Sequence, residues 1–262
     1  MADFNIAALQ LSTLAWGDSK LGHYWKICDD MNIELLLLGE YVLNLFFKEF
    51  ESIPNDMNEK QSLARLENII EMSRQYRPKL LAPIIRFSGR RVYKSLAIIH
   101  QGEVEYYDAQ RLLAFEHWNE KAFFSNSTPK NLKNPPIFTL HGLKVGVIFG
   151  FEVYFDEIWI KFKKLGVDVV LVSSVCTFES MGRWREILKT RAFLGSCYIL
   201  RANRVGEYIP SENDWIWRFY GDSLFISPSG DIESSLEDKE GLLTASIYSE
   251  KITEEKKNWQ FR

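Results

Sequence analysis

The sequence contains few cysteines, little net charge and no long apolar run. Three cysteines in 262 residues, Cys28, Cys176 and Cys197, are too few and too odd in number for a disulfide framework, and they indicate a reducing compartment. The 32 basic residues nearly balance 35 acidic ones, leaving a net charge of −3. This balance gives no electrostatic footprint for nucleic acid or for an anionic membrane. The longest aliphatic run, at residues 35–38, is far too short to span a bilayer.

The N-terminal stretch does not have the pattern of a signal peptide. It lacks a basic start, and Asp3, Asn5 and Gln10 interrupt its apolar residues. We therefore expect a cytoplasmic protein that contacts neither membrane nor nucleic acid. The four histidines show no spacing typical of a metal site, and we expect neither a metal nor a cofactor. With 46% hydrophobic residues, the chain can form a sizeable core.

Strand-like and helix-like segments alternate along the chain. The patterns predict strands over 4–11, 33–38, 79–86, 92–100, 103–107, 143–148, 167–172, 197–202, 223–227 and 242–247, and helices over 20–30, 59–76, 156–165 and 182–194. Gln101 and Gly102 form a two-residue hairpin turn, and 125–136 is a loop. This order predicts a single α/β sandwich domain over 1–262, in which 250–262 is a partly helical C-terminal tail.

The helix predicted over 59–76 has the clearest amphipathic pattern. Its apolar stripe consists of Leu63, Leu66, Ile69 and Ile70. Arg65 lies off that stripe and is expected to face solvent, together with the other charged residues of the helix.

Three predicted strand ends carry candidate functional residues, because functional groups of α/β folds gather just past the carboxyl ends of strands. Glu40 follows the buried strand 33–38. The segment 106–112 follows the predicted hairpin, and the segment 146–152 completes another buried strand.

Several segments give the chain a resemblance to the nitrilase superfamily, the carbon–nitrogen hydrolases. These are the opening strand Ile6-Ala7-Ala8-Leu9-Gln10-Leu11, the pair Arg191-Ala192, the turn Ala202-Asn203-Arg204-Val205-Gly206, and the late segments Gly221-Asp222-Ser223 and Ser227-Pro228-Ser229-Gly230. The resemblance covers nearly the whole chain. It implies an α-β-β-α sandwich, hydrolysis of non-peptide carbon–nitrogen bonds, and a homodimer formed by helices packed across a two-fold axis.

The resemblance also implies where the catalytic groups of the family should fall. Members use a cysteine nucleophile, a glutamate base, an oxyanion-binding lysine and a second glutamate. The base matches Glu40 and the second glutamate matches Glu120, whereas the lysine position falls on Ala109 and the nucleophile position on Gly150. Gly39 stands where a proline usually precedes the base. Since loss of such a nucleophile costs about a million-fold in turnover, we expect the family chemistry to be negligible.

Other residues are candidates for the wall of the same pocket. Phe151 and Glu152 follow the nucleophile position directly. Cys176 is either a core cysteine or an alternative nucleophile, and His117 is either a surface residue or a ligand contact. A buried Glu40 without a lysine at residue 109 would have a raised pKa or would recruit another cation, for which Lys121 and Arg111 are the candidates.

The sequence thus favours a catalytically degenerate member that binds an unknown protein partner or a small amide-like ligand. One alternative is an amidase whose natural residues at 109 and 150 have been replaced. Another is a hydrolase that works from Glu40 together with another group, such as Glu120 or Cys176. The aromatic segment 215–220 is an interface or lid, or else an edge of the core.

Overall fold

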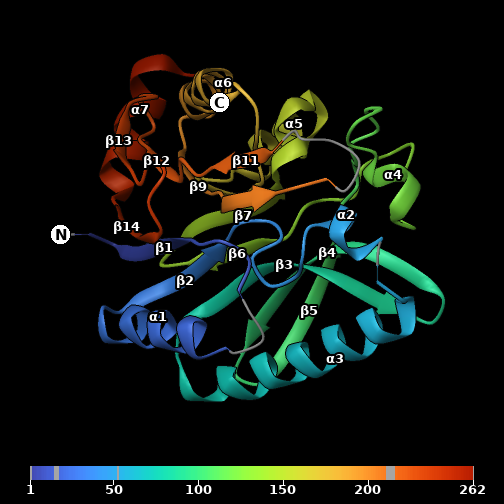
Figure 1. Cartoon of the computed structure of the whole chain (residues 1–262). Helices are drawn as coiled ribbons and strands as arrows, with labels where there is room; N and C mark the ends of the chain where they lie inside the picture. Colours follow the sequence, from blue (N-terminus) through green and yellow to red (C-terminus); the bar gives the residue numbers. More distant parts are fainter. Residues whose placement is uncertain (1, 15–17, 52, 211–215, 262) are drawn as a thin grey trace.

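The computed structural model describes residues 2–14, 18–51, 53–210 and 216–261. Two six-stranded sheets pack face to face, and helices cover their outer faces (Figure 1). The largest cluster of buried apolar side chains lies between the sheets. A smaller cluster lies between the first sheet and its helices, and another between the second sheet and its helices. The mixed α/β sandwich predicted from the sequence is confirmed.

The first sheet has the strand order β14-β1-β2-β3-β4-β5. Strands β1 to β3 are parallel, and the two edges of the sheet are antiparallel. Helices α1 (Ser19–Asp30) and α3 (Asn55–Met72) cover its outer face. The strands are β1 (Phe4–Gln10), β2 (Ile33–Leu38), β3 (Lys79–Ser88), β4 (Arg91–His100), β5 (Glu103–Asp108) and β14 (Gly241–Ile247).

The second sheet has the order β13-β12-β9-β8-β7-β6 and carries α5 (Asp156–Leu165) and α6 (Met181–Gly195) on its outer face. Its strands are β6 (Ile137–Leu140), β7 (Leu143–Phe149), β8 (Val169–Ser173), β9 (Tyr198–Ala202), β12 (Leu224–Ile226) and β13 (Ile232–Ser235). The remaining elements are α2 (Phe47–Phe50), η1 (Ser73–Gln75), α4 (Glu120–Phe123), η2 (Gly150–Tyr154), the hairpin β10 (Val205–Tyr208) and β11 (Trp217–Tyr220), and α7 (Ser249–Trp259).

All ten predicted strands and all four predicted helices have counterparts within a few residues of the expected bounds. The short strands β6, β10, β11 and β13 and the short helices α2 and α4 were not predicted. Segments this short show too little periodicity to stand out. The strands among them form here because neighbouring strands offer backbone partners.

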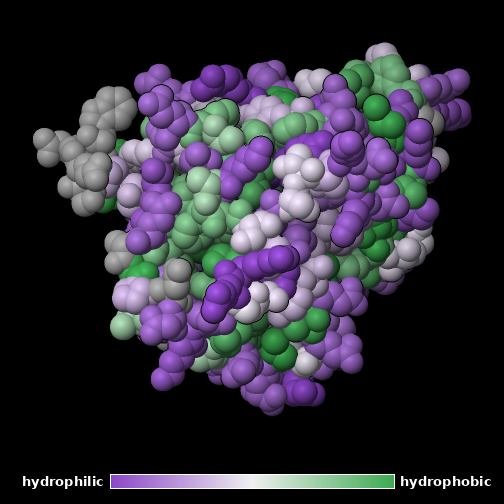
Figure 2. Space-filling model, turned by 90° about the vertical axis from the view of Figure 1, so that its right-hand side faces the viewer, coloured by the Kyte–Doolittle hydropathy of each residue, from purple (hydrophilic) through white to green (hydrophobic). Residues whose placement is uncertain are grey.

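The surface on the α4 side of the molecule is shown in Figure 2. Hydrophobic side chains are visible on this face, but hydrophilic residues break them up. Within the described ranges, no helix combines the length and the apolar character needed to cross a membrane.

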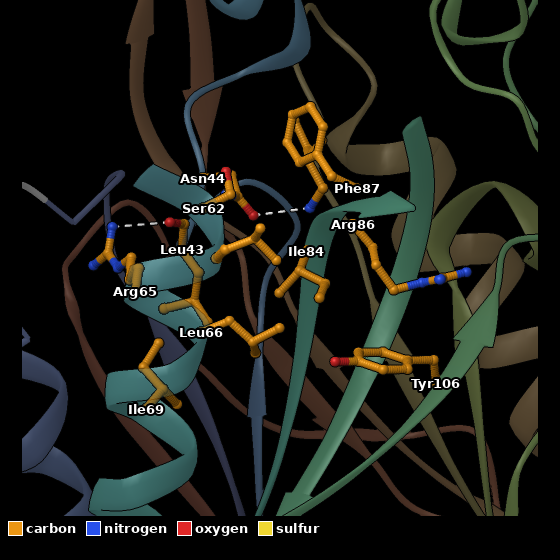
Figure 3. Close-up of a pocket in the computed structure, with 12 residues that line it drawn as sticks. Leu43, Asn44, Ser62, Arg65, Leu66, Ile69, Ile84, Arg86, Phe87 and Tyr106 are labelled. Carbon is orange, nitrogen blue, oxygen red and sulfur yellow. Dashed lines mark hydrogen bonds between the residues drawn. The ribbon is translucent and has the colours of Figure 1, made fainter. Parts of the chain in front are cut away.

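The expected orientation of α3 is wrong at its N-terminal half. Leu63 is 42% exposed. Arg65 instead turns inward, where it donates hydrogen bonds to the carbonyl oxygen of Leu43 (2.8 Å) and to Asp18 Oδ1 (3.0 Å). This half of the helix borders a pocket of about 130 Å³ against β3 (Figure 3). Leu63 is one of the residues that line this pocket, so it does not pack into the core. The Asp18 carboxylate and the carbonyl oxygens of Leu14 and Leu43 bind the Arg65 guanidinium and keep it from facing solvent.

Candidate active site

Residues that follow four strands meet at one end of the sandwich. Glu40 comes after β2, Ala109 after β5, Gly150 after β7 and Ser174 after β8. The amide of Gly150 donates to Glu40 Oε1 (3.3 Å), and the amide of Glu40 donates to the Ser174 carbonyl oxygen (3.0 Å). The structure therefore brings Glu40 and Gly150 together as the resemblance implies, and it adds Ser174.

A buried lysine that was not predicted from the sequence lies between the two glutamates. Lys94 Nζ is 2.5 Å from Glu40 Oε2 and 2.6 Å from Glu120 Oε1. The three side chains are only 5%, 3% and 0% exposed. Tyr41 donates its hydroxyl to Glu120 Oε1 over 2.8 Å. One ammonium group thus serves two carboxylates out of contact with solvent.

The strand geometry explains why Lys94 points inward. On β4, Leu96 and Ile98 belong to the core between the sheets, whereas Ala97 and Ile99 face the helices. Side chains of a strand alternate between faces, so Lys94 shares the inner face with Leu96 and Ile98. A lysine at an inward position of a predicted strand was the signal that could have identified it.

The expectation that Lys121 or Arg111 supplies the cation is wrong. Lys121 is exposed on the short helix α4, and Arg111 pairs with Glu157 at 3.3 Å. Arg111 lies in a loop and Lys121 on a helix of only four residues, and the sequence pattern fixes the direction of neither side chain, whereas Lys94 is held by two neighbouring strands.

Burial controls the charge state of Glu40. It raises the pKa of this carboxyl from 4.5 to about 7, because desolvation of the charged form and the nearby Glu120 outweigh the attraction of Lys94. Burial also raises the pKa of the Tyr41 hydroxyl, which therefore stays protonated and donates to Glu120. The two carboxylates and the lysine could exchange protons, but residue 150 has no nucleophilic side chain.

Glu152 is fully buried but serves a different purpose. It accepts hydrogen bonds from the Tyr107 hydroxyl (3.0 Å), the Gln110 amide (2.8 Å) and the Phe149 amide (3.1 Å). These bonds join the segment after β5 to the turn after β7. Glu152 therefore fixes the backbone on both sides of the site. Lys94 influences its pKa only through long-range electrostatics.

Two glycines mark places where backbones approach too closely for a side chain. A Cβ atom at Gly150 would lie 2.7 Å from Ser174 Cβ and 3.1 Å from Ser174 Cα. A Cβ atom at Gly39 would lie 2.7 Å from the carbonyl carbon of Asn203. Carbon atoms in contact normally lie about 3.5–4.0 Å apart. The chain thus closes around Glu40 at the two positions where the resemblance expects a cysteine and a proline.

The other pocket candidates lie apart from the lysine and its two glutamates. Cys176 is buried beside Arg201 and Tyr220, and burial raises the pKa of its thiol. His117 is exposed and stacks on Phe115 at the surface. Phe151 is half-buried and packs against Phe115 and against Tyr154 and Phe155, which follow it closely in the sequence.

Aromatic side chains fill the space next to Tyr41. The ring centroid of Phe46 lies 5.2 Å from that of Tyr41. It lies 5.0–6.0 Å from the ring centroids of Trp118, Trp217 and Phe219. All of these are buried. Within the segment 215–220, Trp217 and Phe219 therefore belong to the core, whereas Ile216 is 52% exposed and Trp215 lies outside the described residues.

No group of three or more metal-ligating side chains was found among the described residues. The pocket of Figure 3 lies between α3 and the outer face of the first sheet, and its lining includes none of Glu40, Lys94, Glu120 and Gly150. The carboxylates and the lysine are thus the strongest functional constellation.

Comparison with known proteins identifies the class that this fold and site define. The sequence profile of the carbon–nitrogen hydrolases matches residues 6–257, so the chain belongs to the carbon–nitrogen hydrolase family. A deaminated glutathione amidase of Rattus norvegicus is 27% identical over 125 residues, which are 47% of this chain and 36% of that protein. A 2-oxoglutaramate amidase of Bacillus subtilis (strain 168) is 28% identical over 111 residues, 42% of this chain and 40% of that protein. The matched stretches therefore span well under half of these relatives.

Solved structures share the fold over almost the full chain. A carbon–nitrogen hydrolase of Helicobacter pylori G27 superimposes with a TM-score of 0.82 at 18% identity, covering 98% of this chain and 94% of the other. An amidase variant of Nesterenkonia sp. AN1 superimposes with a TM-score of 0.76 at 19% identity, covering 98% and 97%. That structure shows the acetamide moiety of fluoroacetamide covalently added to the active-site cysteine of the amidase.

Proposed function

We propose that this protein is a carbon–nitrogen hydrolase family member that does not carry out the hydrolysis of its family. The observation that supports this most directly is Gly150. It stands where the family resemblance expects the nucleophile, and Ser174 occupies the space that a side chain there would need. Without a nucleophile, no covalent acyl intermediate forms, and Glu40 has no thiol proton to accept.

The geometry does not favour Cys176 as a substitute nucleophile. A reactive thiol needs a lowered pKa and access to substrate. Cys176 is 4% exposed, and burial raises the pKa of its thiol despite the neighbouring Arg201. Glu40 and Glu120 are already engaged by Lys94, so neither carboxylate is directed at Cys176.

The proposal is tested by incubating the purified protein with a panel of aliphatic amides, ω-amides of dicarboxylic acids and nitriles. Ammonia release is measured, and the intact mass is examined for an acyl adduct. We expect ammonia release at the level of buffer and no adduct. Saturable turnover that disappears in a Glu40→Gln variant would overturn the proposal, because it would show that the geometry around Glu40 supports chemistry from another nucleophile.

We propose further that the protein is cytoplasmic and acts as a homodimer that binds a protein partner or a small amide-like ligand. The helix pair α5–α6 is the surface expected to form the dimer. It exposes Ile160 (52%) and Leu194 (46%), and a cavity of about 290 Å³ lies between the two helices. Burial of such side chains is favourable at about 25 cal/mol per Å² of apolar surface.

Light scattering of the wild type and an Ile160→Asp variant tests the dimer. We expect a wild-type dimer and a monomeric variant. Leu63→Asp is the matched control, because Leu63 is similarly exposed but lies on α3 in the opposite outer layer (Figure 1). A monomeric wild type, or dimers in all three proteins, would contradict the assignment of this surface.

A further inference from the structure

We propose that Lys94 is the residue that holds Glu40 and Glu120 in position, and that residue 109, just past the end of the neighbouring strand, is an equivalent place from which to supply the same cation. Lys94 lies on β4, and Ala109 directly follows β5. The two strands are antiparallel with Ser95 opposite Asp108, and the Ala109 amide donates to the Lys94 carbonyl oxygen over 2.9 Å. Residues 94 and 109 are therefore directly opposed.

Directly opposed residues of an antiparallel pair place their side chains on the same face, with Cβ atoms about 4.5–5.5 Å apart. Ala109 belongs to the core cluster between the sheets and is 1% exposed. Its methyl group thus points to the same inner face as the Lys94 side chain. The flexible four-carbon stem of a lysine spans a difference of this size, so an ammonium group from either strand can reach the two carboxylates.

The backbone at both positions is fixed by one side chain. Asn126 accepts from the Lys94 amide (2.9 Å) and donates to the carbonyl oxygens of Lys94 (2.9 Å) and Ala109 (2.9 Å). Residues 94 and 109 therefore cannot separate without breaking this set of bonds. An exchange of side chains between them leaves the frame around them unchanged.

A cation is needed at this point because two carboxylates are buried there. Removal of one partner of a buried ion pair leaves an uncompensated charge and is strongly destabilising, and for a domain of this size it lowers Tm by roughly 6–20 °C. A second lysine added while Lys94 is present meets a position already occupied by Nζ and a like charge. Only one of the two positions can carry the lysine, which agrees with an alanine at residue 109.

The test compares Tm of the wild type with Lys94→Ala, Ala109→Lys and the combined variant. We expect both single changes to lower Tm and the combined variant to recover at least half of the loss caused by Lys94→Ala. Lys94→Met is the matched control, because it keeps an unbranched apolar stem and removes the charge. We expect it to be destabilised like Lys94→Ala, which separates the charge from the packing of the stem.

The pH profile distinguishes a positioning cation from a filler of space. In Lys94→Met the unpaired carboxylates take up protons as pH falls, so we expect its Tm deficit at pH 8 to shrink at pH 5, and the combined variant to regain the wild-type profile. A combined variant no more stable than Lys94→Ala, or a Lys94→Met variant as stable as the wild type at pH 8, would overturn the proposal. These readouts measure stability, so they stand or fall separately from the turnover assay.

Discussion

A side chain at residue 150 should destabilise the protein, and the smallest test is Gly150→Ala. The added methyl group would lie 2.7 Å from Ser174 Cβ, which is about 1 Å inside normal contact. Ser174 cannot retreat easily. Its amide donates to Ala202 (2.9 Å), its carbonyl accepts from Glu40 (3.0 Å), and its hydroxyl accepts from Arg201 Nε (2.9 Å).

Insertion of atoms into a packed interior costs typically 1–3 kcal/mol. For this site we expect Gly150→Ala to lower the free energy of unfolding by about 2–3 kcal/mol, at the upper end of that range because the obstructing Cβ and Cα atoms belong to one residue, Ser174, that three hydrogen bonds hold in place. This corresponds to a Tm lower by roughly 4–12 °C. Gly150→Cys should cost at least as much, since its sulfur extends beyond the same Cβ.

Urea denaturation of a double-mutant cycle measures the effect. Ser174→Gly removes the Cβ atom that lies closest, at the expense of its hydroxyl bonds. We expect Gly150→Ala to cost at least 1 kcal/mol less in the Ser174→Gly background than in the wild type, since contacting residues couple by about 0.5–3 kcal/mol. The steric account of Gly150 is refuted if Gly150→Ala is as stable as the wild type, or if its cost is the same in both backgrounds.

Two further expectations follow from burial of titratable groups. The pKa of Glu40 is raised from 4.5 to about 7, so the folded state binds this proton more tightly and loses stability as pH rises through that window. The free energy of unfolding is measured from pH 4 to 8 for the wild type and Glu40→Gln. Between these two pH values, the stability of Glu40→Gln relative to the wild type should increase by about 3 kcal/mol. If the two proteins show the same change of stability with pH, the raised pKa of Glu40 is contradicted. Iodoacetamide should alkylate the native protein slowly at all three buried cysteines, with full labelling in urea as the control. Rapid modification of Cys176 alone below pH 7 would instead indicate an activated thiol.

The sandwich was predictable because its long elements carry strong periodic signals. The run Ile33–Leu38 is apolar on both faces, and it is the parallel strand β2 buried between α1 and the opposite sheet. The pair Gln101-Gly102 predicted a tight turn, and both residues have positive φ angles of 50° and 82°. These signals are local, so a sequence pattern is sufficient to detect them.

The site was only partly predictable, because its members come from separate parts of the chain. Glu40 was found from its place after a buried strand, but its partner is 54 positions away in a strand whose inward face was not assigned residue by residue. Ser174 was missed for a different reason. It acts on residue 150 through the closeness of its Cβ and Cα atoms, and this closeness depends on how the segments after β7 and β8 pack together, which the residue type serine does not indicate. Tyr41 has a φ angle of 59°, a conformation that its residue type does not suggest.

The contacts around Gly150 also bear on whether the family chemistry could be restored. Residue 150 has no nucleophilic side chain, and Ser174 occupies the space that such a side chain would need. Because Gly39 and Gly150 have no side chains, Asn203 and Ser174 can pack closely against the chain on two sides of Glu40. The Gly150 amide and Lys94 both now engage the Glu40 carboxylate. A cysteine side chain at residue 150 would therefore clash with Ser174. A lysine at residue 109 would compete with Lys94 for the same carboxylates. For this reason Gly150→Cys with Ala109→Lys should remain without turnover unless residues 94 and 174 are changed as well.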